Sequence, residues 1–453
     1  MVKFNYWKIY SFLGLGLIFF YLILETYLLI HKNFLGDLPV LLHAAYAIRN
    51  GYDPYQFTHG YFIYPPLQAF IFIPLTFLKL KIACLLWTVI NFLLIFFILM
   101  LNFRIIATHF KFQCSRWQAT AACSLALLMC YHELWWEIKW TQYDLMILAG
   151  FTLGLYWLDR RPYTSGIILG LIANIKYQPI VFIPYFLLRA RFKIIVAIVV
   201  GITLGMLLPV AKLGWAKNLA YLKKASSGFI HMPGESLLNT YYPVKVPQIT
   251  WSGNITITSG LTRVFLDHGW SQNRALITVF LIAVLTFLLL WRLFKKFAIP
   301  FMWRKPGLFC SSKEPAVVTL EYFLIMIGML IFSPQGTMRH FILLLGAHLL
   351  AIMLLLFPRN NVKRWPLLLG VLCYQAGKLY DDLIAHPLHW PWSYFGGPAW
   401  CLLIFMPLLV ITSLSYLRDL FQEQSVVDVS QPFSLREHGF LVSIPDSSKA
   451  GTQ

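Results

Sequence analysis

Asp37 is the acidic residue that first suggests a chemical role, because it follows closely on the first long apolar run, near 9–30. Apolar residues then recur at helical spacing from Leu38 to Ile48, which predicts a short amphipathic helix, and Gly51 is suited to end it. Asp37 therefore stands at a helix N-terminus beside the membrane. A carboxylate there can act as a general base or cap the helix, and position alone favours the cap.

Three cationic side chains are functional candidates because they interrupt apolar sequence. Lys176 lies between two short apolar segments, and Arg339 and His340 begin a later one. Ionisable residues within membrane spans are costly and indicate functional sites by default. The alternatives are structural. Lys176 could reach the interface or cap a hairpin, and Arg339 with His340 could anchor a helix at the interface.

The composition predicts that most of the molecular surface faces lipid. Of the 453 residues, 59% are hydrophobic and 12% are charged, and the mean hydropathy is +0.67; soluble domains are about one quarter charged. The apolar runs are continuous rather than alternating, which indicates helices. We therefore predict an all-α polytopic membrane protein. The net charge of +19 does not indicate a nucleic-acid partner, because the basic residues form short clusters between apolar runs.

About twelve membrane-spanning helices are predicted, with boundary errors of about two to four residues. They lie near 9–30, 82–103, 117–131, 143–158, 163–175, 179–188, 194–213, 275–294, 316–332, 338–357, 366–385 and 397–417. A further apolar segment, 64–78, is predicted to be re-entrant or interfacial. If this segment crossed the membrane, the basic clusters would fall on opposite sides of it. Pro65, Pro66 and Pro74 also favour a broken helix.

This arrangement assigns the two sides of the membrane. The basic clusters and both termini are predicted to be cytoplasmic, whereas two long loops, 31–63 and 214–274, are predicted to be extracytoplasmic. Residues 1–417 would form the transmembrane domain. The polar segment 418–453 would form a flexible cytoplasmic tail. The loop 214–274 is long enough to predict a functional role.

Five stretches of the chain, in the same order, resemble the motifs of glycosyltransferase family 87. They are Asp37 with Gly51-Tyr52-Asp53-Pro54-Tyr55 and Tyr64-Pro65-Pro66, then Thr141-Gln142-Tyr143-Asp144, then the Gly-rich hairpin 165–179 with Lys176 and Pro179, then Asn254 with Leu261-Thr262-Arg263, and finally Ser333-Pro334 with Arg339-His340. The likeness extends from about residue 10 to residue 360. Each motif alone is loose, and the ordered set is more specific.

The resemblance implies a GT-C-type fold and an extracytoplasmic active site. It implies that Asp37 is the catalytic base, that Lys176, Arg339 and His340 bind the phosphate of a polyprenyl-phosphate sugar, and that Tyr64, Gln142 and Asn254 contact substrate. A carboxylate can deprotonate an acceptor hydroxyl, and cations stabilise a departing phosphate. Neither a metal nor another cofactor is required in principle, and no extracytoplasmic loop carries an Asp-x-Asp pair.

The chain departs from the family pattern at two of these motifs. The family's Gly-Gln-x-Asn segment reads Thr141-Gln142-Tyr143-Asp144 here, and its His-His pair reads Arg339-His340. Arginine keeps a cation that can bind phosphate but cannot act as a base. These departures bear on which donor the resemblance implies more than on which type of reaction it implies.

The function predicted from the resemblance is an inverting glycosyltransferase. It would move a hexose, mannose by resemblance, from polyprenyl phosphate to a glycolipid or glycan outside a bacterial inner or plasma membrane. Two alternatives stay open. The buried acids Glu25 and Glu321 would suit a secondary transporter, and a non-catalytic relative could bind lipid-linked sugars. The bilayer, the donor and the acceptor are the partners expected.

Overall fold

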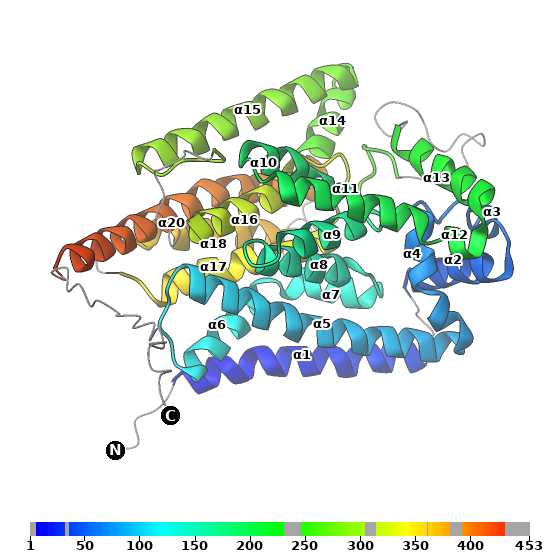
Figure 1. The fold of residues 1–453 in the computed structure, drawn as a ribbon, viewed down its shortest axis with the longest axis horizontal. Coiled ribbons are helices and arrows are strands. Elements are labelled where there is room, and N and C mark those ends of the chain that lie inside the picture. Colours follow the sequence, from blue (N-terminus) through cyan, green and yellow to red (C-terminus); the bar gives the residue numbers. More distant parts are fainter. Residues whose placement is uncertain are drawn as a thin grey trace, which may run out of the picture.

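The structure, a computed structural model, is a bundle of helices that run along a common direction (Figure 1). It describes residues 6–31, 36–230, 245, 247–303, 314–359, 361–380 and 392–430, and these ranges contain no strand. The bundle is built from α1 (Tyr6–His31), α5 (Leu80–His109), α6 (Arg116–Met129), α8 (Asp144–Trp157), α9 (Pro162–Ala173), α10 (Phe182–Leu188), α11 (Phe192–Leu207), α15 (Gln272–Lys296), α16 (Glu314–Phe332), α17 (Leu345–Leu356), α18 (Trp365–Tyr380) and α20 (Gly397–Ser430).

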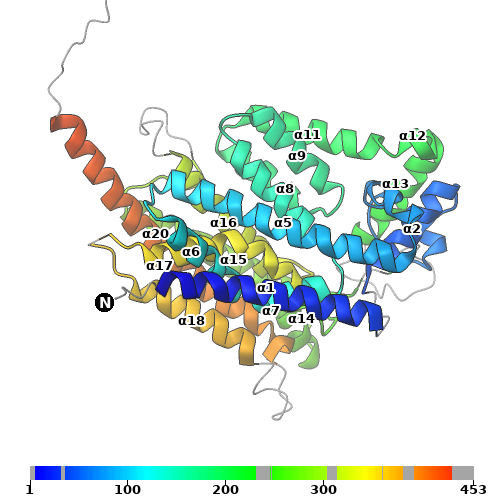
Figure 2. The same ribbon diagram turned by 90° about the horizontal axis from the view of Figure 1, so that it is seen from below.

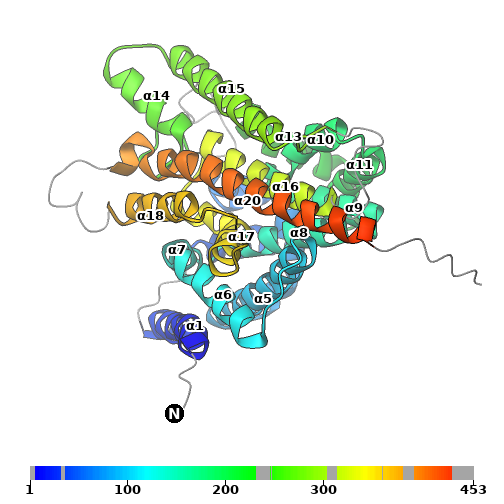
Figure 3. The ribbon, with the colours of Figure 1, turned by 90° about the vertical axis from the view of Figure 1, so that its left-hand side faces the viewer.

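Shorter elements connect the long helices. They are α2 (Leu38–Asn50), α3 (Pro54–Phe57), α4 (Pro66–Ile71), η1 (Ile73–Phe77), α7 (Tyr131–Lys139), η2 (Gln178–Val181), α12 (Val210–Leu213), α13 (Trp215–Ile230), α14 (Ile257–Asp267), η3 (Met338–Leu344) and η5 (Trp392–Phe395). Viewed along its length, the bundle has α1 at one edge and α15 at the other (Figure 3).

The all-α polytopic architecture predicted from composition is confirmed. Within the described residues, seven helical segments are long and apolar enough to cross a membrane. All twelve segments predicted as spans are helical, apart from 381–385, which lies outside the described residues. The other five, namely α6, α8, α9, η2 with α10, and α18, are shorter than the seven. Seven of the about twelve predicted crossings therefore have the length and apolarity to span a membrane, and the crossing of the membrane by the five shorter segments stays a prediction.

The two predicted extracytoplasmic loops meet at one end of the bundle. There α2, α3, α4, α12 and α13 gather, whereas the start of α1 and the end of α20 lie at the opposite end (Figures 1 and 2). Lys224 on α13 forms an ion pair with Asp53, the residue that caps α3. The backbone N–H of Lys245 donates to the carbonyl of Gly60 over 2.8 Å. The Lys224–Asp53 pair joins residues 171 positions apart, so two loops that are distant in the chain form one surface.

The structure adds detail to three sequence predictions. The segment 64–78 is broken as predicted, into α4 and η1; its depth in the membrane stays a prediction. The loop 214–274 is not irregular throughout, because it contains α13 and α14. The predicted flexible tail starts too early at 418, because α20 continues to Ser430; residues 431–453 lie outside the described part of the chain.

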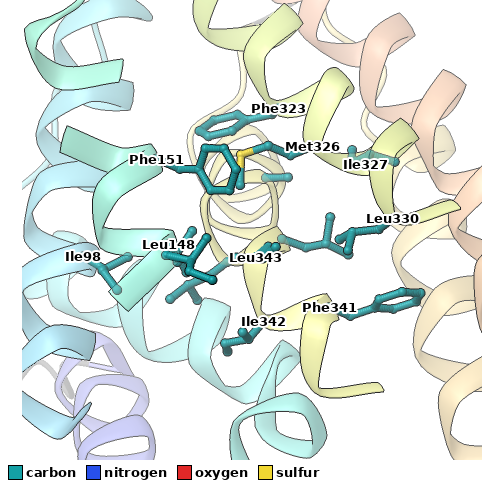
Figure 4. Close-up of a cluster of buried hydrophobic side chains, with 14 of the residues drawn as sticks. Ile98, Leu148, Phe151, Phe323, Met326, Ile327, Leu330, Phe341, Ile342 and Leu343 are labelled. Carbon is teal, nitrogen blue, oxygen red and sulfur yellow. The ribbon is translucent and has the colours of Figure 1, made fainter. Parts of the chain in front are cut away.

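An apolar cluster fixes η3, the element that carries Arg339 and His340. Figure 4 shows Leu148 and Phe151 of α8 facing Met326 of α16, with Ile342 and Leu343 of η3 beside them. All five side chains are buried. Side chains in such a close-packed interior resist displacement. The polar side chains at the start of η3 are therefore held in a fixed position.

A buried ion pair fastens the other end of the bundle. The guanidinium of Arg189 donates to both carboxylate oxygens of Glu321, from Nη2 over 2.5 Å and from Nε over 2.8 Å. The hydroxyl of Tyr185 and the backbone N–H of Met302 also donate to that carboxylate. Glu321, one of the acids that suited a transporter, is thus held by four hydrogen bonds that join α10, α16 and the segment before residue 303.

Glycines set the position of Lys176 through the contact between α9 and α11. A Cβ added to Gly170 would lie 2.2 Å from the carbonyl oxygen of Ile198, and one added to Gly201 would lie 2.3 Å from that of Ile167. Small residues let two helices approach at backbone contact, as in many membrane bundles. Since α9 ends at Ala173, this close approach determines where the following residues emerge.

We predict that Gly170→Ala lowers the stability of the protein by about 1–3 kcal/mol, because the added methyl group meets backbone that cannot yield locally. Thermal unfolding in detergent, followed by circular dichroism, measures the change. Gly16→Ala on α1 is the control, since a Cβ there meets nothing within 4 Å. Equal midpoints for the two variants would contradict the proposed backbone contact.

Candidate active site

Asp37 occupies the N-cap position of α2, yet its side chain does not cap the helix. Its Oδ2 accepts a hydrogen bond from Nε2 of Gln142 over 2.6 Å. The same oxygen accepts from Nη1 of Arg339 over 3.0 Å. The capping role favoured by position alone is therefore wrong for this carboxylate. Its side chain is still 47% exposed, so it keeps surface for a substrate.

A tight crossing of two connecting segments brings Asp37 to Gln142. Gly36 has φ +60°, and a Cβ on it would lie 2.4 Å from Oγ1 of Thr141 and 2.5 Å from the carbonyl oxygen of Trp140. The backbone N–H of Asp37 donates to that carbonyl over 2.9 Å. Glycine is suited to this conformation and to this approach. The residue before the carboxylate thus allows the loop after α1 to touch the loop between α7 and α8.

A second polar cluster is formed by Lys176, Asp144 and His340. Lys176 forms an ion pair with the fully buried carboxylate of Asp144. Nε2 of His340 lies 3.7 Å from Oδ2 of Asp144. Nδ1 of His340 accepts a hydrogen bond from the backbone N–H of Thr337 over 2.9 Å, so this ring also caps η3. Because Nδ1 accepts this hydrogen bond, the neutral ring carries its hydrogen on Nε2.

Arg339 connects the two clusters. It pairs with Asp37 on one side, and Asp144 is a charge neighbour on the other. Glu137 is fully buried nearby, and its Oε1 accepts from the backbone N–H of Leu145 over 3.2 Å. Burial, and then the charge of Asp144, raises the pKa of Glu137 well above its ordinary value. Lys176 pairs with Asp144 and Arg339 pairs with Asp37, so two cations face two carboxylates beside it.

Two cavities meet at this charged group. The first, about 520 Å³, is lined by Tyr64, Lys176, Asn254 and His340 together with apolar side chains of α16 and η2. The second, about 650 Å³, is lined by Asp37 and by several aromatic rings. Four residues line both cavities: Pro247, Trp251, Thr337 and Arg339. Arg339 is the charged member of that shared wall.

Arg263 of α14 holds this wall in place. Its guanidinium donates to the backbone carbonyls of Trp251 over 2.9 Å and of Asn254 over 2.9 Å. It also donates to the carbonyls of Ser393 over 3.2 Å and of Tyr394 over 2.7 Å. A single buried cation thus joins the segment before α14 to η5. The sequence gives Arg263 as part of a motif, but its carbonyl partners depend on the fold.

The structure places all seven candidate residues around the two cavities, although their environments differ. Asp37, Lys176, Arg339, His340 and Tyr64 line a cavity directly. Gln142 is buried and acts through Asp37. Asn254 also lines the first cavity, but its amide bonds backbone: Nδ2 donates to the carbonyl of Gln248 over 3.1 Å, and Oδ1 accepts from the N–H of Gly336 over 3.3 Å.

Sequence reasoning did not connect three members of the site to Asp37. Asp144 was visible only as a departure from a motif, and its partner Lys176 lies 32 residues away. Glu137 was visible only as part of an acidic and aromatic loop that could hold a sugar or form an interfacial belt, and Trp251 had no signal. Among the described residues, no three His, Cys, Asp or Glu side chains are grouped in a way that could hold a metal ion.

Comparison with known proteins gives one match. The family model described as glycosyltransferase family 87 matches residues 62–304, a range that includes Tyr64, Gln142, Lys176, Asn254 and Arg263. No curated protein and no solved structure matches the chain.

We predict that Lys176→Met destabilises the protein by about 3 kcal/mol or more, because it leaves the Asp144 carboxylate buried without its cation. The double variant Lys176→Met/Asp144→Asn should recover at least half of the loss. Thermal unfolding in detergent measures both. Lys295→Met is the control, since Lys295 is exposed at the end of α15, lies over the ring of Trp291 and should matter little. A double variant as unstable as the single one would contradict a coupled pair.

Proposed function

Because the chain belongs to glycosyltransferase family 87, we propose that this multi-pass membrane glycosyltransferase uses a polyprenyl-phosphate sugar as its donor. The sugar is a hexose, with mannose suggested by the family resemblance, and the acceptor is a hydroxyl of a glycolipid or glycan. Asp37 is the proposed base. The observation that carries the proposal is the pair of cavities that meet at Arg339, beside that carboxylate.

The cavity that contains Lys176 suits a lipid-linked phosphate. Its lining includes the polar side chains of Lys176, Arg339 and His340 and the apolar side chains of Val181 and Met329. Val181 is 38% exposed on the outer surface of η2, and its neighbour Ile180 is 43% exposed. An apolar chain could therefore leave the cavity towards the bilayer while its phosphate stays near the cations. Cations placed in a site of low dielectric stabilise such charge more strongly than they would in water.

The reaction step follows from the position of the carboxylate. The acceptor oxygen attacks C1 of the donor sugar, and the bond between C1 and the phosphate oxygen breaks with its electron pair going to phosphate. The acceptor proton moves to Asp37. The products are the inverted glycoside and polyprenyl phosphate. Arg339 and Lys176 stabilise the charge that the phosphate gains as the bond breaks.

Arg339 has a double role in this step. In the structure it bonds Asp37, and it also lines the donor cavity. A planar guanidinium has several donors, so it can hold a carboxylate and a phosphate at once. Gln142 bonds the same oxygen of Asp37 and keeps the base in position if Arg339 moves towards the phosphate.

The proposed side is extracytoplasmic, because the site and the basic clusters lie at opposite ends of the bundle. Asp144, at the start of α8, belongs to the site, whereas Arg160 follows the far end of that helix. The same reasoning places Lys295, at the end of α15, away from the site (Figure 1). The positive-inside rule then assigns the basic end and both termini to the cytoplasm.

We predict that Asp37→Asn lowers the rate of sugar transfer at least 100-fold, because the amide keeps the shape but cannot take the acceptor proton. The unfolding temperature should stay close to that of the wild type, since the side chain is about half exposed. Transfer from radiolabelled polyprenyl-phosphate mannose to a lipid extract, with purified protein, measures the rate.

Asp53→Asn is the matched control for this variant. Asp53 lies in the same loop, and asparagine can still cap α3. Its transfer rate should remain near that of the wild type. If Asp37→Asn transfers sugar as fast as the wild type, Asp37 is not the base, even though the family assignment stands.

We predict that Gly328→Leu raises the KM for a long-chain donor about tenfold, the equivalent of about 1.4 kcal/mol of lost contacts. Gly328 lines the donor cavity, and a Cβ there meets nothing within 4 Å, so the leucine should fill the cavity without disturbing the fold. Initial rates with donors of long and short prenyl chains test this. Gly16→Leu is the control. An unchanged KM for the long-chain donor would show that the chain lies elsewhere.

A further inference from the structure

One face of α7 presents a row of rings to the cavity beside Asp37. His132, Trp136 and Trp140 are spaced four residues apart, so they follow one face of the helix and continue into its C-cap. All three line the 650 Å³ cavity, and Trp251 lines it as well. The rings of Trp136 and Trp140 are nearly parallel, with 7° between their planes and 6.3 Å between centroids. Nε1 of Trp136 donates to Nε2 of His132 over 2.9 Å.

The other face of α7 is anchored in the protein interior. Glu133 and Glu137, also four residues apart, are fully buried. Glu133 accepts hydrogen bonds from Nζ of Lys378 over 2.9 Å and from the hydroxyl of Tyr374 over 2.9 Å. Because these contacts fix the orientation of α7, the rings form a rigid surface.

The charges around this cavity are compensated in pairs. Asp37 pairs with Arg339, and Lys378, which also lines the cavity, pairs with Glu133. A bound ligand therefore meets no excess of cations that would select an anion. The cavity offers flat apolar rings, with a carboxylate and the hydroxyl-bearing residues Ser252 and Thr337 at its edges. Sites of this kind combine aromatic walls with a few polar groups that fix orientation.

We propose that this ring surface, formed by Trp136 and Trp140, binds the saccharide end of the acceptor. A pyranose has C–H bonds on its faces and hydroxyl groups on its edge, which matches flat rings beside a carboxylate. The stacked sugar would direct one hydroxyl towards Asp37. The inference rests on the proposed function for the transfer step, and it deepens that function by naming the residues that bind the sugar of the acceptor.

An interfacial aromatic belt is the structural alternative, and exposure argues against it. Belt residues face outwards, as do Trp215, Trp303 and Trp365, which are 62%, 60% and 65% exposed. Trp136 and Trp140 are only partly exposed, and both line the cavity beside Asp37. They are therefore placed for a ligand within the protein.

The test compares two acceptors of equal chain length, octyl α-mannoside and octanol, with purified protein in nanodiscs and polyprenyl-phosphate mannose as donor. We expect transfer to the mannoside and little transfer to octanol. Trp140→Ala should raise the KM for the mannoside about tenfold and leave the KM for the donor unchanged. Trp140→Phe, which keeps a ring, should recover most of the affinity. Trp215→Ala, on exposed α13, is the control.

A binding measurement separates this inference from the proposed function. Saturation-transfer NMR with methyl α-mannoside should show contact of the ring protons with the wild type and loss of that contact in Trp140→Ala, whether or not transfer occurs. Equal binding by the two proteins, or equal transfer to octanol, would overturn the stacking site and leave the glycosyltransferase reaction intact. If the wild type binds the mannoside but transfers no sugar to it, and Trp140→Ala does not bind it, the result would count against the proposed donor and support the stacking site.

Discussion

The ion pair between Arg339 and Asp37 is the interaction on which the site depends. It joins residues 302 positions apart and closes the wall between the two cavities. The two side chains are 23% and 47% exposed, so this partly solvated pair contributes little to stability and acts mainly by holding the two groups in position. Once it is formed, the loop after α1 is fixed against η3, which the core between α8 and α16 already holds. The position of the proposed base is therefore set by packing far from it in the sequence.

The two residues at which the site departs from the family pattern carry opposite charges, and these charges also compensate each other. Asp144 stands where the pattern has asparagine, and Arg339 stands where it has histidine. The structure brings both residues into one group, in which Arg339 feels the charge of Asp144. One substitution adds a negative charge and the other adds a positive charge, so the group remains balanced. A donor phosphate would meet Lys176 already paired with Asp144. In the proposed site the phosphate therefore shares its cations with carboxylates of the protein.

The two faces of α7 show how one short helix can serve both stability and recognition. Its buried acids, Glu133 and Glu137, hold it to the interior, and its rings face a cavity. Arg263 performs the same task for the opposite wall, because its hydrogen bonds go to backbone carbonyls and so fix the path of the chain around Trp251. The two proposed substrates would meet between α7 and the chain segment around Trp251.

The sequence alone predicted the fold class, the helical segments and seven candidate residues, six of which line a cavity, because apolar length and motif order are local properties that need no partner. It also indicated that Lys176 interrupts apolar sequence. Only the tertiary structure decided that Asp37 does not cap its helix, that Asp144 neutralises Lys176, and that Asn254 bonds backbone. Each of these depends on which distant residue supplies the partner. A side chain in a low-dielectric interior takes the nearest group that satisfies its charge or hydrogen bonds, and sequence spacing does not specify that neighbour.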